Sequence, residues 1–436
     1  MTSVSREFDV LVVGAGPAGL AAARAASRHG KRVGLMDARA DAGGQVWRTD
    51  VKQGMPPPAR RMMAALTRHG VTWLGQSEIL MGQPDELLAE TAKGTVRVPC
   101  RRLVLATGAR ELLLPFPGWT LPGVMGAGGA QALAKQGWPV RDRSVVVSGS
   151  GPLLLATAAT LRRHGARVLA IHEQTAPRNL WRFAAHLPRW PQRLLQAMAL
   201  RTRLAGVSYR AGSVVTCAHG DQRLQAVTVE DHHGRRQRID CDLLATGYGL
   251  VPNVELAAML GCQLTREAGQ PCVLVDDGQH TSIGHVLAAG EVCGIGGRDC
   301  ALIEGAIAGH MAAGHAAPAQ ALARQRRRAR AFAGLLHDCF RLDERVAALA
   351  GDHTLVCRCE DVPLHALRDC TDARDARLAA RCGMGACQGR ICGAALRVLR
   401  PFPGYARPLA RPRPPLVPAT IDSLTSLSTH SRGADR

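Results

Sequence analysis

Two glycine-rich turns, each directly after a short apolar run, limit the folds that this chain can adopt. The first, Gly14-Ala-Gly-Pro-Ala-Gly19, follows the apolar run 10–13 and precedes an alanine-rich segment. The second, Gly149-Ser-Gly-Pro-Leu-Leu154, follows the run 145–147. A buried strand that turns through Gly-x-Gly into a helix begins a parallel βαβ unit of the dinucleotide-binding type. We therefore predict an α/β fold with two Rossmann-like dinucleotide-binding domains.

The first turn has the residues that a dinucleotide requires. Gly14 permits the tight turn, Gly16 lets the backbone approach a pyrophosphate, and Gly19 allows close packing of helix and strand. Asp37 ends the next strand, 33–36, at the position where a carboxylate accepts hydrogen bonds from the adenosine ribose. The alternative is a turn without nucleotide, in which the glycines serve packing alone.

The second turn departs from the pattern. Leu154 stands where the third glycine is expected, and we expect it to crowd the helix against the strand and any pyrophosphate. Glu173 follows the strand 167–171, and a carboxylate there suits the free ribose hydroxyl of NAD. Binding of NAD(P) at Gly149, Gly151 and Glu173 stays open, beside the alternative of an empty or altered nucleotide domain.

Four cysteines near the C-terminus form two close pairs, Cys357-Arg-Cys359 and Cys387-Gln-Gly-Arg-Ile-Cys392. A [2Fe-2S] cluster needs four thiolate ligands, and two tight loops with two cysteines each can supply them. Glycines at 383, 385 and 389 would let backbone N–H groups point at the sulfides.

Other interpretations of these cysteines remain open. Structural zinc also takes four thiolates, although its cysteines are usually separated by two to four residues, and buried cysteines can lack a metal altogether. Cys370 and Cys382 are further thiols in the same stretch. We predict an iron–sulfur cluster held by Cys357, Cys359, Cys387 and Cys392.

Charge and composition limit the kinds of partner and the cellular compartment that we expect. The net charge is +20, with five arginines at 324–330, yet aromatic residues are only 3% and no nucleic-acid-binding motif is present. We therefore expect a solvated arginine-rich surface and no nucleic-acid partner, with an acidic protein as the alternative. There is no apolar run of about 18 residues and no signal segment, so we expect no transmembrane segment and a cytoplasmic, reducing compartment.

In combination, these motifs resemble the A subunits of opine oxidases and the related subunits of hydroxyproline dehydrogenase and hydrogen cyanide synthase. The resemblance covers about residues 8–418. It implies a fold of the pyridine nucleotide-disulfide reductase type with a small C-terminal helical module, similar to the bacterioferritin-associated-ferredoxin-like [2Fe-2S] domain. It rests on the two glycine turns and on 43–48, 106–108 and 382–390.

The resemblance also implies FAD at the first site. Gly44 and Gln45 belong to a stretch similar to the flavin-contacting segment of such flavoproteins, and Thr107 and Gly108 to a second such stretch. Gly290-Glu291 resembles the segment whose acid binds the ribityl chain of FAD. That acid is usually Asp, and Glu291 departs from the pattern by being one methylene longer.

We divide the chain on this basis. The expected parts are 1–138 and 251–330 (the two parts of the FAD-binding domain), 139–250 (the second nucleotide-binding domain), 350–400 (the [2Fe-2S] module) and 401–436 (a proline-rich, partly disordered tail). A linker helix is expected near 318–330.

The resemblance implies an FAD- and [2Fe-2S]-dependent enzyme subunit that passes electrons onward from an amine-oxidase-like flavoprotein partner, which oxidises the C–N bond of an opine or amino acid. The sequence does not identify the electron acceptor.

No catalytic residue is assigned, because His172, His232 and His233 are better interpreted as packing or surface residues. No Cys-x-x-Cys occurs, which argues against a dithiol mechanism. The alternatives are a self-sufficient NAD(P)H-dependent flavin reductase and a non-catalytic assembly subunit.

Overall fold

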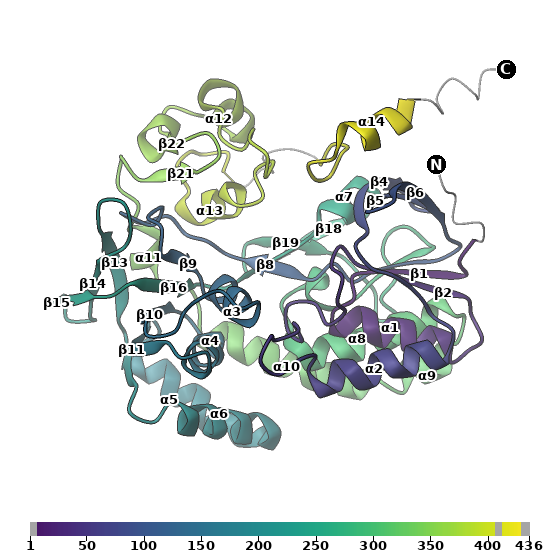
Figure 1. Ribbon diagram of the computed structural model, residues 1–436, viewed down its shortest axis with the longest axis horizontal. Helices are drawn as coiled ribbons and strands as arrows, with labels where there is room; N and C mark the ends of the chain where they lie inside the picture. The colour runs from purple at the N-terminus through teal and green to yellow at the C-terminus, as the bar shows by residue number, and fades with distance from the viewer. Residues whose placement is uncertain (1–6, 406–411, 429–436) are drawn as a thin grey trace.

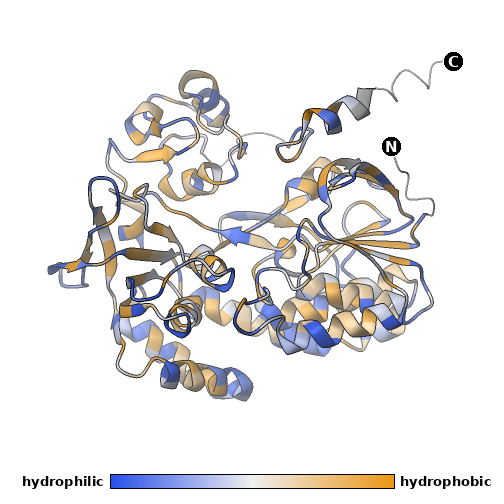
Figure 2. Ribbon diagram, viewed as in Figure 1, coloured by the Kyte–Doolittle hydropathy of each residue, from blue (hydrophilic) through white to orange (hydrophobic). Residues whose placement is uncertain are grey.

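The computed structural model describes residues 7–405 and 412–428. Two α/β bodies lie side by side, each built on a five-stranded parallel sheet, and a small cysteine-rich unit lies beside the second (Figure 1). Apolar residues are concentrated in the strands of both sheets, whereas the outer strand β15 (Arg236–Asp240) is largely polar (Figure 2). The predicted α/β class with two Rossmann-like cores is confirmed.

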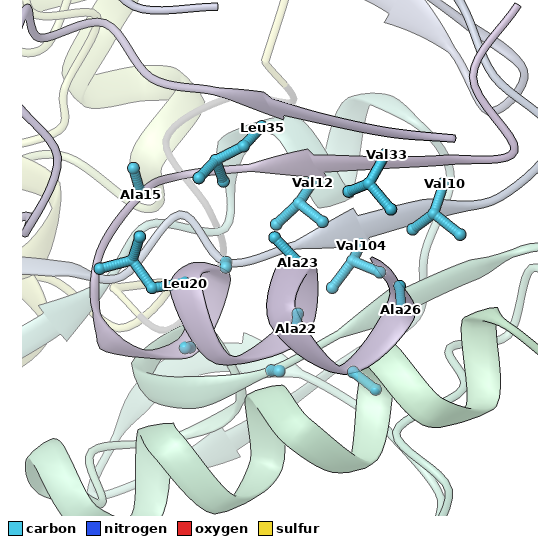
Figure 3. Packing of buried hydrophobic residues seen from close by; sticks show 14 of the residues in the cluster. Val10, Val12, Ala15, Leu20, Ala22, Ala23, Ala26, Val33, Leu35 and Val104 are labelled. Carbon is cyan, nitrogen blue, oxygen red and sulfur yellow. The ribbon is translucent and has the colours of Figure 1, made fainter. Parts of the chain in front are cut away.

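The first sheet is assembled from two distant stretches of chain. Its order is β20 (Val286–Ala288), β7 (Leu103–Leu105), β1 (Val10–Val13), β2 (Val33–Met36) and β3 (Thr72–Leu74). The whole of β1 is buried, as a central parallel strand covered on both faces must be. Apolar side chains of β1 and β2 pack onto α1 (Pro17–Ser27), whose Ala23 and Ala26 face the sheet (Figure 3).

Helix α8 (Gly297–Ala312) packs directly against α1, which small residues make possible. A Cβ built on Gly305 would lie 2.1 Å from the carbonyl oxygen of Ala18. One built on Gly309 would lie 2.2 Å from the carbonyl oxygen of Ala22. The glycines therefore let the two helix backbones touch, and the later stretch of chain is fixed against the first glycine turn.

The second sheet has the same parallel pattern. Its order is β12 (Ser208–Ala211), β11 (Arg167–Glu173), β10 (Ser144–Gly149), β16 (Leu243–Gly247) and β9 (Val124–Gly126). Helices α3 (Ala127–Lys135) and α4 (Leu153–Arg163) share a core with one face of this sheet. Antiparallel strands that the sequence patterns do not predict flank both sheets; they are β4 (Glu78–Gln83), β5 (Glu86–Thr91), β6 (Gly94–Pro99), β13 (Val214–His219), β14 (Ala226–Glu230) and β15.

A two-stranded ribbon of β8 (Ala109–Glu111) and β17 (Leu250–Pro252) runs between the two bodies (Figure 1). Further helices and strands of the two bodies and their connections are α2 (Pro57–Arg68), α5 (Pro177–His186), α6 (Pro191–Arg203), α7 (Glu255–Met259), β18 (Leu264–Glu267), β19 (Gln270–Val273), α9 (Ala316–Gln320), α10 (Ala323–Cys339) and α11 (Glu344–Ala347). Helix α10 is thus present where the linker helix is expected, but it begins and ends later than predicted. Over the described residues, no helix is both long and apolar enough to cross a bilayer.

The cysteine-rich unit has a small core of its own. It contains β21 (Leu355–Cys357), β22 (Val362–Pro363), α12 (Ala373–Ala380) and α13 (Cys392–Leu399). The indole N–H of Trp119 donates to the carbonyl oxygen of Leu355 at 2.7 Å, and the guanidinium of Arg358 lies 5.3 Å from the Trp119 ring centre. These contacts attach the unit to the second body.

Two expectations need correction. The tail is predicted to be extended or disordered, but Ile421–Ser428 form α14, and Thr420 before it donates to the Glu90 carboxylate at 2.6 Å; residues 406–411 and 429–436 lie outside the described residues. The arginine run is not simply a solvated surface. Arg326 and Arg330 form ion pairs with Glu304, which is fully buried. A buried carboxylate is costly unless opposite charges pair with it, and the two arginines supply these charges.

Candidate cofactor sites

The first glycine turn is shaped by contacts that exclude side chains. Gly14 has a φ of 98°, and a Cβ there would lie 2.2 Å from the carbonyl oxygen of Ala106. A Cβ on Gly19 would lie 1.7 Å from the carbonyl oxygen of Gly14. A Cβ on Gly16 would meet only the Cα of Gly44, at 3.9 Å. The turn is therefore tight against the sheet and the helix, and Gly16 leaves its backbone accessible to a phosphate.

Asp37 lies beside this turn, as predicted. One of its carboxylate oxygens accepts a hydrogen bond from the Ala15 N–H at 2.6 Å, and the other accepts one from the Arg39 N–H at 2.9 Å. Its side chain is only partly buried. A carboxylate oriented in this way keeps lone pairs for the hydroxyls of a ribose.

The segment after Asp37 contains buried polar atoms without partners. The Nε of Arg48 and the hydroxyl of Thr49 are buried and make no hydrogen bond in the described structure. The same guanidinium donates to the Gln45 side chain at 2.6 Å, and burial lowers the pKa of Arg48. Unpaired buried donors next to an accessible glycine turn fit an anionic dinucleotide such as FAD.

The other predicted FAD contacts lie on loops around the same sheet. The Thr107 hydroxyl donates to the Asn253 carbonyl oxygen at 2.7 Å, which fixes this loop, while a Cβ on Gly108 would meet no atom within 4 Å. Gly290 has a φ of 80°, and its N–H donates to buried Glu304 at 3.2 Å. Burial raises the pKa of Glu291, whose carboxylate accepts from the Gly297 N–H at the start of α8.

The second glycine turn differs in its acidic residue. One oxygen of Glu173 accepts from the Gly151 N–H at 2.7 Å, and the other accepts from the Thr175 N–H at 3.0 Å. Glu173 is 0% exposed, and burial raises its pKa. Its carboxylate is therefore inaccessible to a ribose in this structure, in contrast to that of Asp37.

Leu154 does not crowd the turn in the way the sequence suggests. It is fully buried in the core of the second body, and its Cδ2 would lie 3.3 Å from a Cβ on Gly247. The absence of a side chain at Gly247 makes room for the leucine. Gly149 is packed as tightly as Gly14 of the first turn, because a Cβ on Gly149 would lie 2.0 Å from the Gly247 carbonyl oxygen.

The four predicted cysteine ligands surround one small cavity. Its volume is about 210 Å³, and its lining includes Cys357, Cys359, Cys387 and Cys392 together with Leu113 and Ile391. The sulfurs of Cys359 and Cys387 lie 3.7 Å apart. Cys357 and Cys392 are buried, whereas Cys359 is exposed. The four thiols thus form an inner and an outer pair, the donor set that either a [2Fe-2S] cluster or zinc requires.

A fifth thiol, Cys382, joins the inner pair. The sulfurs of Cys357, Cys382 and Cys392 lie within 4.8 Å of one another. Hydrogen bonds from the Cys382 and Cys392 thiols strongly lower the pKa of Cys357, which favours its thiolate form. Cys382 does not line the cavity, so the structure presents it as an additional neighbour of the predicted quartet.

Strand β8 connects the loop at Thr107 and Gly108, beside the first glycine turn, with the sulfur cavity. It starts directly after Thr107 and Gly108, and the Arg110 Nε on it donates to the Arg390 carbonyl oxygen in the cysteine loop at 3.3 Å. Leu113, just beyond the strand, lines the sulfur cavity. No sequence motif points to Arg110 or Leu113, whereas Arg48 lies within the Gly-Gly-Gln-Val-Trp-Arg stretch and could have been considered.

Comparisons with known proteins agree with this architecture. Residues 8–321 match the family described as pyridine nucleotide-disulphide oxidoreductase. The HcnB subunit of hydrogen cyanide synthase from Pseudomonas aeruginosa is 32% identical, over 97% of this chain and 99% of its own. The corresponding opine oxidase chain of Agrobacterium tumefaciens, its A subunit, is 31% identical, over 90% of this chain and 85% of its own. The resemblance drawn from the motifs is thus confirmed for these two kinds of protein.

Among solved structures, L-proline dehydrogenase from P. horikoshii has a TM-score of 0.70, with 19% identity. The match covers 97% of this chain and 80% of that one. At this level of identity the likeness concerns the fold, which extends over the cysteine-rich unit as well as both α/β bodies.

Proposed function

Because the chain belongs to the pyridine nucleotide-disulphide oxidoreductase family of FAD-dependent oxidoreductases, we propose that it is an electron-transferring subunit of a heteromeric opine or amino-acid dehydrogenase. It holds FAD at the first glycine turn and a [2Fe-2S] cluster at Cys357, Cys359, Cys387 and Cys392. A partner flavoprotein oxidises the C–N bond of the substrate, and this chain passes the electrons to an acceptor.

The observation that carries this proposal is the short connection between the two sites. Leu113, which lines the sulfur cavity, comes only five positions after Gly108, beside the first site. Five residues of extended chain span at most about 18 Å. The Arg110–Arg390 hydrogen bond fastens the same segment to the cysteine loop. Two redox groups held this close by one strand would form a continuous route for electrons.

The chain's own residues have the following roles in this proposal. Bound FAD would accept and release electrons, and the cluster would carry them one at a time. Gly16 and the N-terminus of α1 hold the pyrophosphate, Asp37 holds the ribose, and the free donors of Arg48 and Thr49 pair with the cofactor. The four thiolates hold the cluster.

The role of a partner is supported by the relatives. The opine oxidase, hydrogen cyanide synthase and sarcosine oxidase chains that this protein is similar to are all named as subunits of larger enzymes. A self-sufficient NAD(P)H-dependent reductase receives less support, because Glu173 at the second turn is fully buried, whereas Asp37 at the first turn is only partly buried.

The test is to isolate the chain from its native cell under anaerobic conditions with any bound partner. We expect an amine-oxidase-like flavoprotein to co-purify, and the absorbance of the cluster to bleach when that partner's opine or amino-acid substrate is added. Full substrate oxidation by this chain alone, with no partner, would contradict the proposal.

A further inference from the structure

The segment that joins α10 to α11 crosses the second glycine turn. The Ser150 hydroxyl donates to the Phe340 carbonyl oxygen at 3.2 Å. The Gln174 side chain donates to the Arg341 carbonyl oxygen at 3.0 Å and accepts from the Asp343 N–H at 3.1 Å. Ser150 and Gln174 follow directly after β10 and β11, so residues 340–343, here called the strap, lie over the carboxyl ends of both strands.

That location is where a dinucleotide binds in this fold. In open parallel sheets, ligands bind outside the carboxyl ends of the strands, with the pyrophosphate against the glycine turn. The ring of Phe340 lies over this turn, 3.8 Å from the position of a Cβ on Gly151. Phe183 of α5 packs edge-on against the Phe340 ring with centres 5.1 Å apart. A pyrophosphate could therefore reach the turn only after this ring had moved.

Polar side chains beside the second turn form hydrogen bonds with the strap. Gln174 directs both ends of its amide to strap backbone, and the Ser150 hydroxyl donates to the strap as well. The strap thus supplies backbone partners to groups that would otherwise face a nucleotide. At the first turn the equivalent glycine, Gly16, faces no aromatic ring among the described residues, because a Cβ there would meet only the Cα of Gly44, at 3.9 Å.

The strap also continues into the connection to the cysteine unit. The guanidinium of Arg345 donates to the Asp343 carboxylate at 2.9 Å and to the Gly212 carbonyl oxygen at 3.4 Å. The Gly212 N–H in turn donates to the carbonyl oxygen of Thr175, beside the second turn. The strap is therefore fixed to the second body at both of its ends.

We propose that the strap is the resident occupant of the second nucleotide site and determines which electron donor the protein accepts. By filling the site it excludes pyridine nucleotides, so that electrons enter only from the partner's reduced flavin. This inference rests on the proposed function for the identity of the donor, but the exclusion of NAD(P)H is a separate property that can be measured alone.

The experiment is saturation-transfer NMR with NADH as the ligand and the full-length, cofactor-loaded chain as the receptor. We expect no saturable signal from the nicotinamide or adenine protons with the native chain up to about 1 mM NADH. We expect signals in the double variant Phe340→Ala/Gln174→Ala, which loosens the strap. Trp181→Ala on α5, where the side chain is 76% exposed, is the matched control and should behave like the native chain.

Each result decides one point. Saturable binding of NADH to the native chain would overturn the proposal. So would a folded double variant, with native flavin and iron content, that still binds no NADH, because the strap would then not be what excludes it. If the double variant does not fold, Gln174→Ala alone is the second variant, judged by the same signals. Failure of a partner to reduce the cluster would instead contradict the proposed function and leave the NADH result unaffected.

Discussion

The sulfur of Cys359 lies 3.7 Å from the sulfur of Cys387, a residue 28 positions further along the chain. Two thiolates on one tetrahedral metal with metal–sulfur bonds of about 2.3 Å are separated by about 3.8 Å. The outer pair therefore already has the spacing of two ligands on one metal. A Cβ on Gly385 would lie 2.3 Å from the Cβ of Cys359, so only glycine allows the two loops to approach in this way.

Replacing an outer ligand should remove the cluster. We expect Cys359→Ser to lose most of its iron and acid-labile sulfide and the visible absorbance of the cluster, while retaining the flavin and its absorbance, because the proposed flavin site lies in the first body. Cys370→Ser is the control, since Cys370 is buried in the same unit but does not line the sulfur cavity. Equal iron content in the two variants would exclude Cys359 as a ligand.

The fifth thiol distinguishes between two ligand sets. If Cys382 is only a neighbour of the cluster, Cys382→Ser should keep a near-native iron and sulfide content, with small shifts in its electron paramagnetic resonance spectrum. If Cys382 replaces Cys387 as a ligand, Cys382→Ser should lose the cluster and Cys387→Ser should keep it. Iron analysis of both variants side by side settles the assignment.

Much of this architecture could be predicted from sequence. The two Gly-x-Gly turns, with Asp37 and Glu173 after the next strands, specify two parallel sheets, because buried parallel strands are short, continuous apolar runs. The cysteine pairs predict a metal unit, since few other roles need four thiols in two tight loops. Each of these patterns involves residues that are close together in the sequence, so it can be recognised without knowing the tertiary contacts.

Other features depend on contacts that no local pattern encodes. The strap residues Phe340–Asp343 have no motif, and their place over Ser150 follows only from the path of the chain between two bodies. From sequence Leu154 looks like an obstruction, because its neighbour Gly247 is distant along the chain. The ion pair between Arg330 and buried Glu304 cannot be predicted for the same reason. An arginine run is typical of an exposed surface, and the sequence does not show that a buried carboxylate lies beside it.

Arg48 should contribute to FAD affinity. Its Nε is buried and unpaired, and a hydrogen bond to a charged group contributes about 1.5–3 kcal/mol. We therefore expect Arg48→Ala to weaken FAD binding by roughly 10- to 150-fold, measured by fluorescence titration of the deflavinated chain. Arg60→Ala, an exposed position on α2, serves as the control. Unchanged affinity in Arg48→Ala would rule out a contact between this guanidinium and the cofactor.

The contact between α1 and α8 should depend on glycine. Because a Cβ on Gly305 would lie 2.1 Å from a backbone oxygen of α1, we expect Gly305→Ala to lower stability by about 1–3 kcal/mol and to lower Tm. In Gly334→Ala on α10 the new methyl meets no atom within 4 Å, so Tm should rise slightly. Differential scanning fluorimetry of both variants checks this, and equal Tm values would contradict the packing described above.

His172 should make the second body sensitive to acid. Burial, aided by the positive charge of Arg210, lowers the pKa of His172 to about 4, and its Nδ1 lies 2.7 Å from the Ser213 hydroxyl. The unfolded chain takes up this proton near pH 6.5 and the folded chain does not, so stability is fully present above pH 6.5 and falls as the pH drops toward 4.

This loss amounts to about 3 kcal/mol at most. His172→Asn should therefore show a flatter decrease of Tm between pH 6.5 and 4 than the native chain, whereas His233→Asn at an exposed position should not differ from it. Identical pH profiles for native chain and His172→Asn would show that this histidine is not held neutral.

The central claim, that one chain holds both a flavin and an iron–sulfur cluster, is tested most directly by a single anaerobic preparation of the full-length protein. Iron, acid-labile sulfide and flavin should be measured on that sample, and the electron paramagnetic resonance spectrum recorded after reduction. The account predicts about two irons, two sulfides and one FAD per chain, with a reduced-state signal of a [2Fe-2S] cluster. One zinc per chain without sulfide, or no bound flavin, would contradict it.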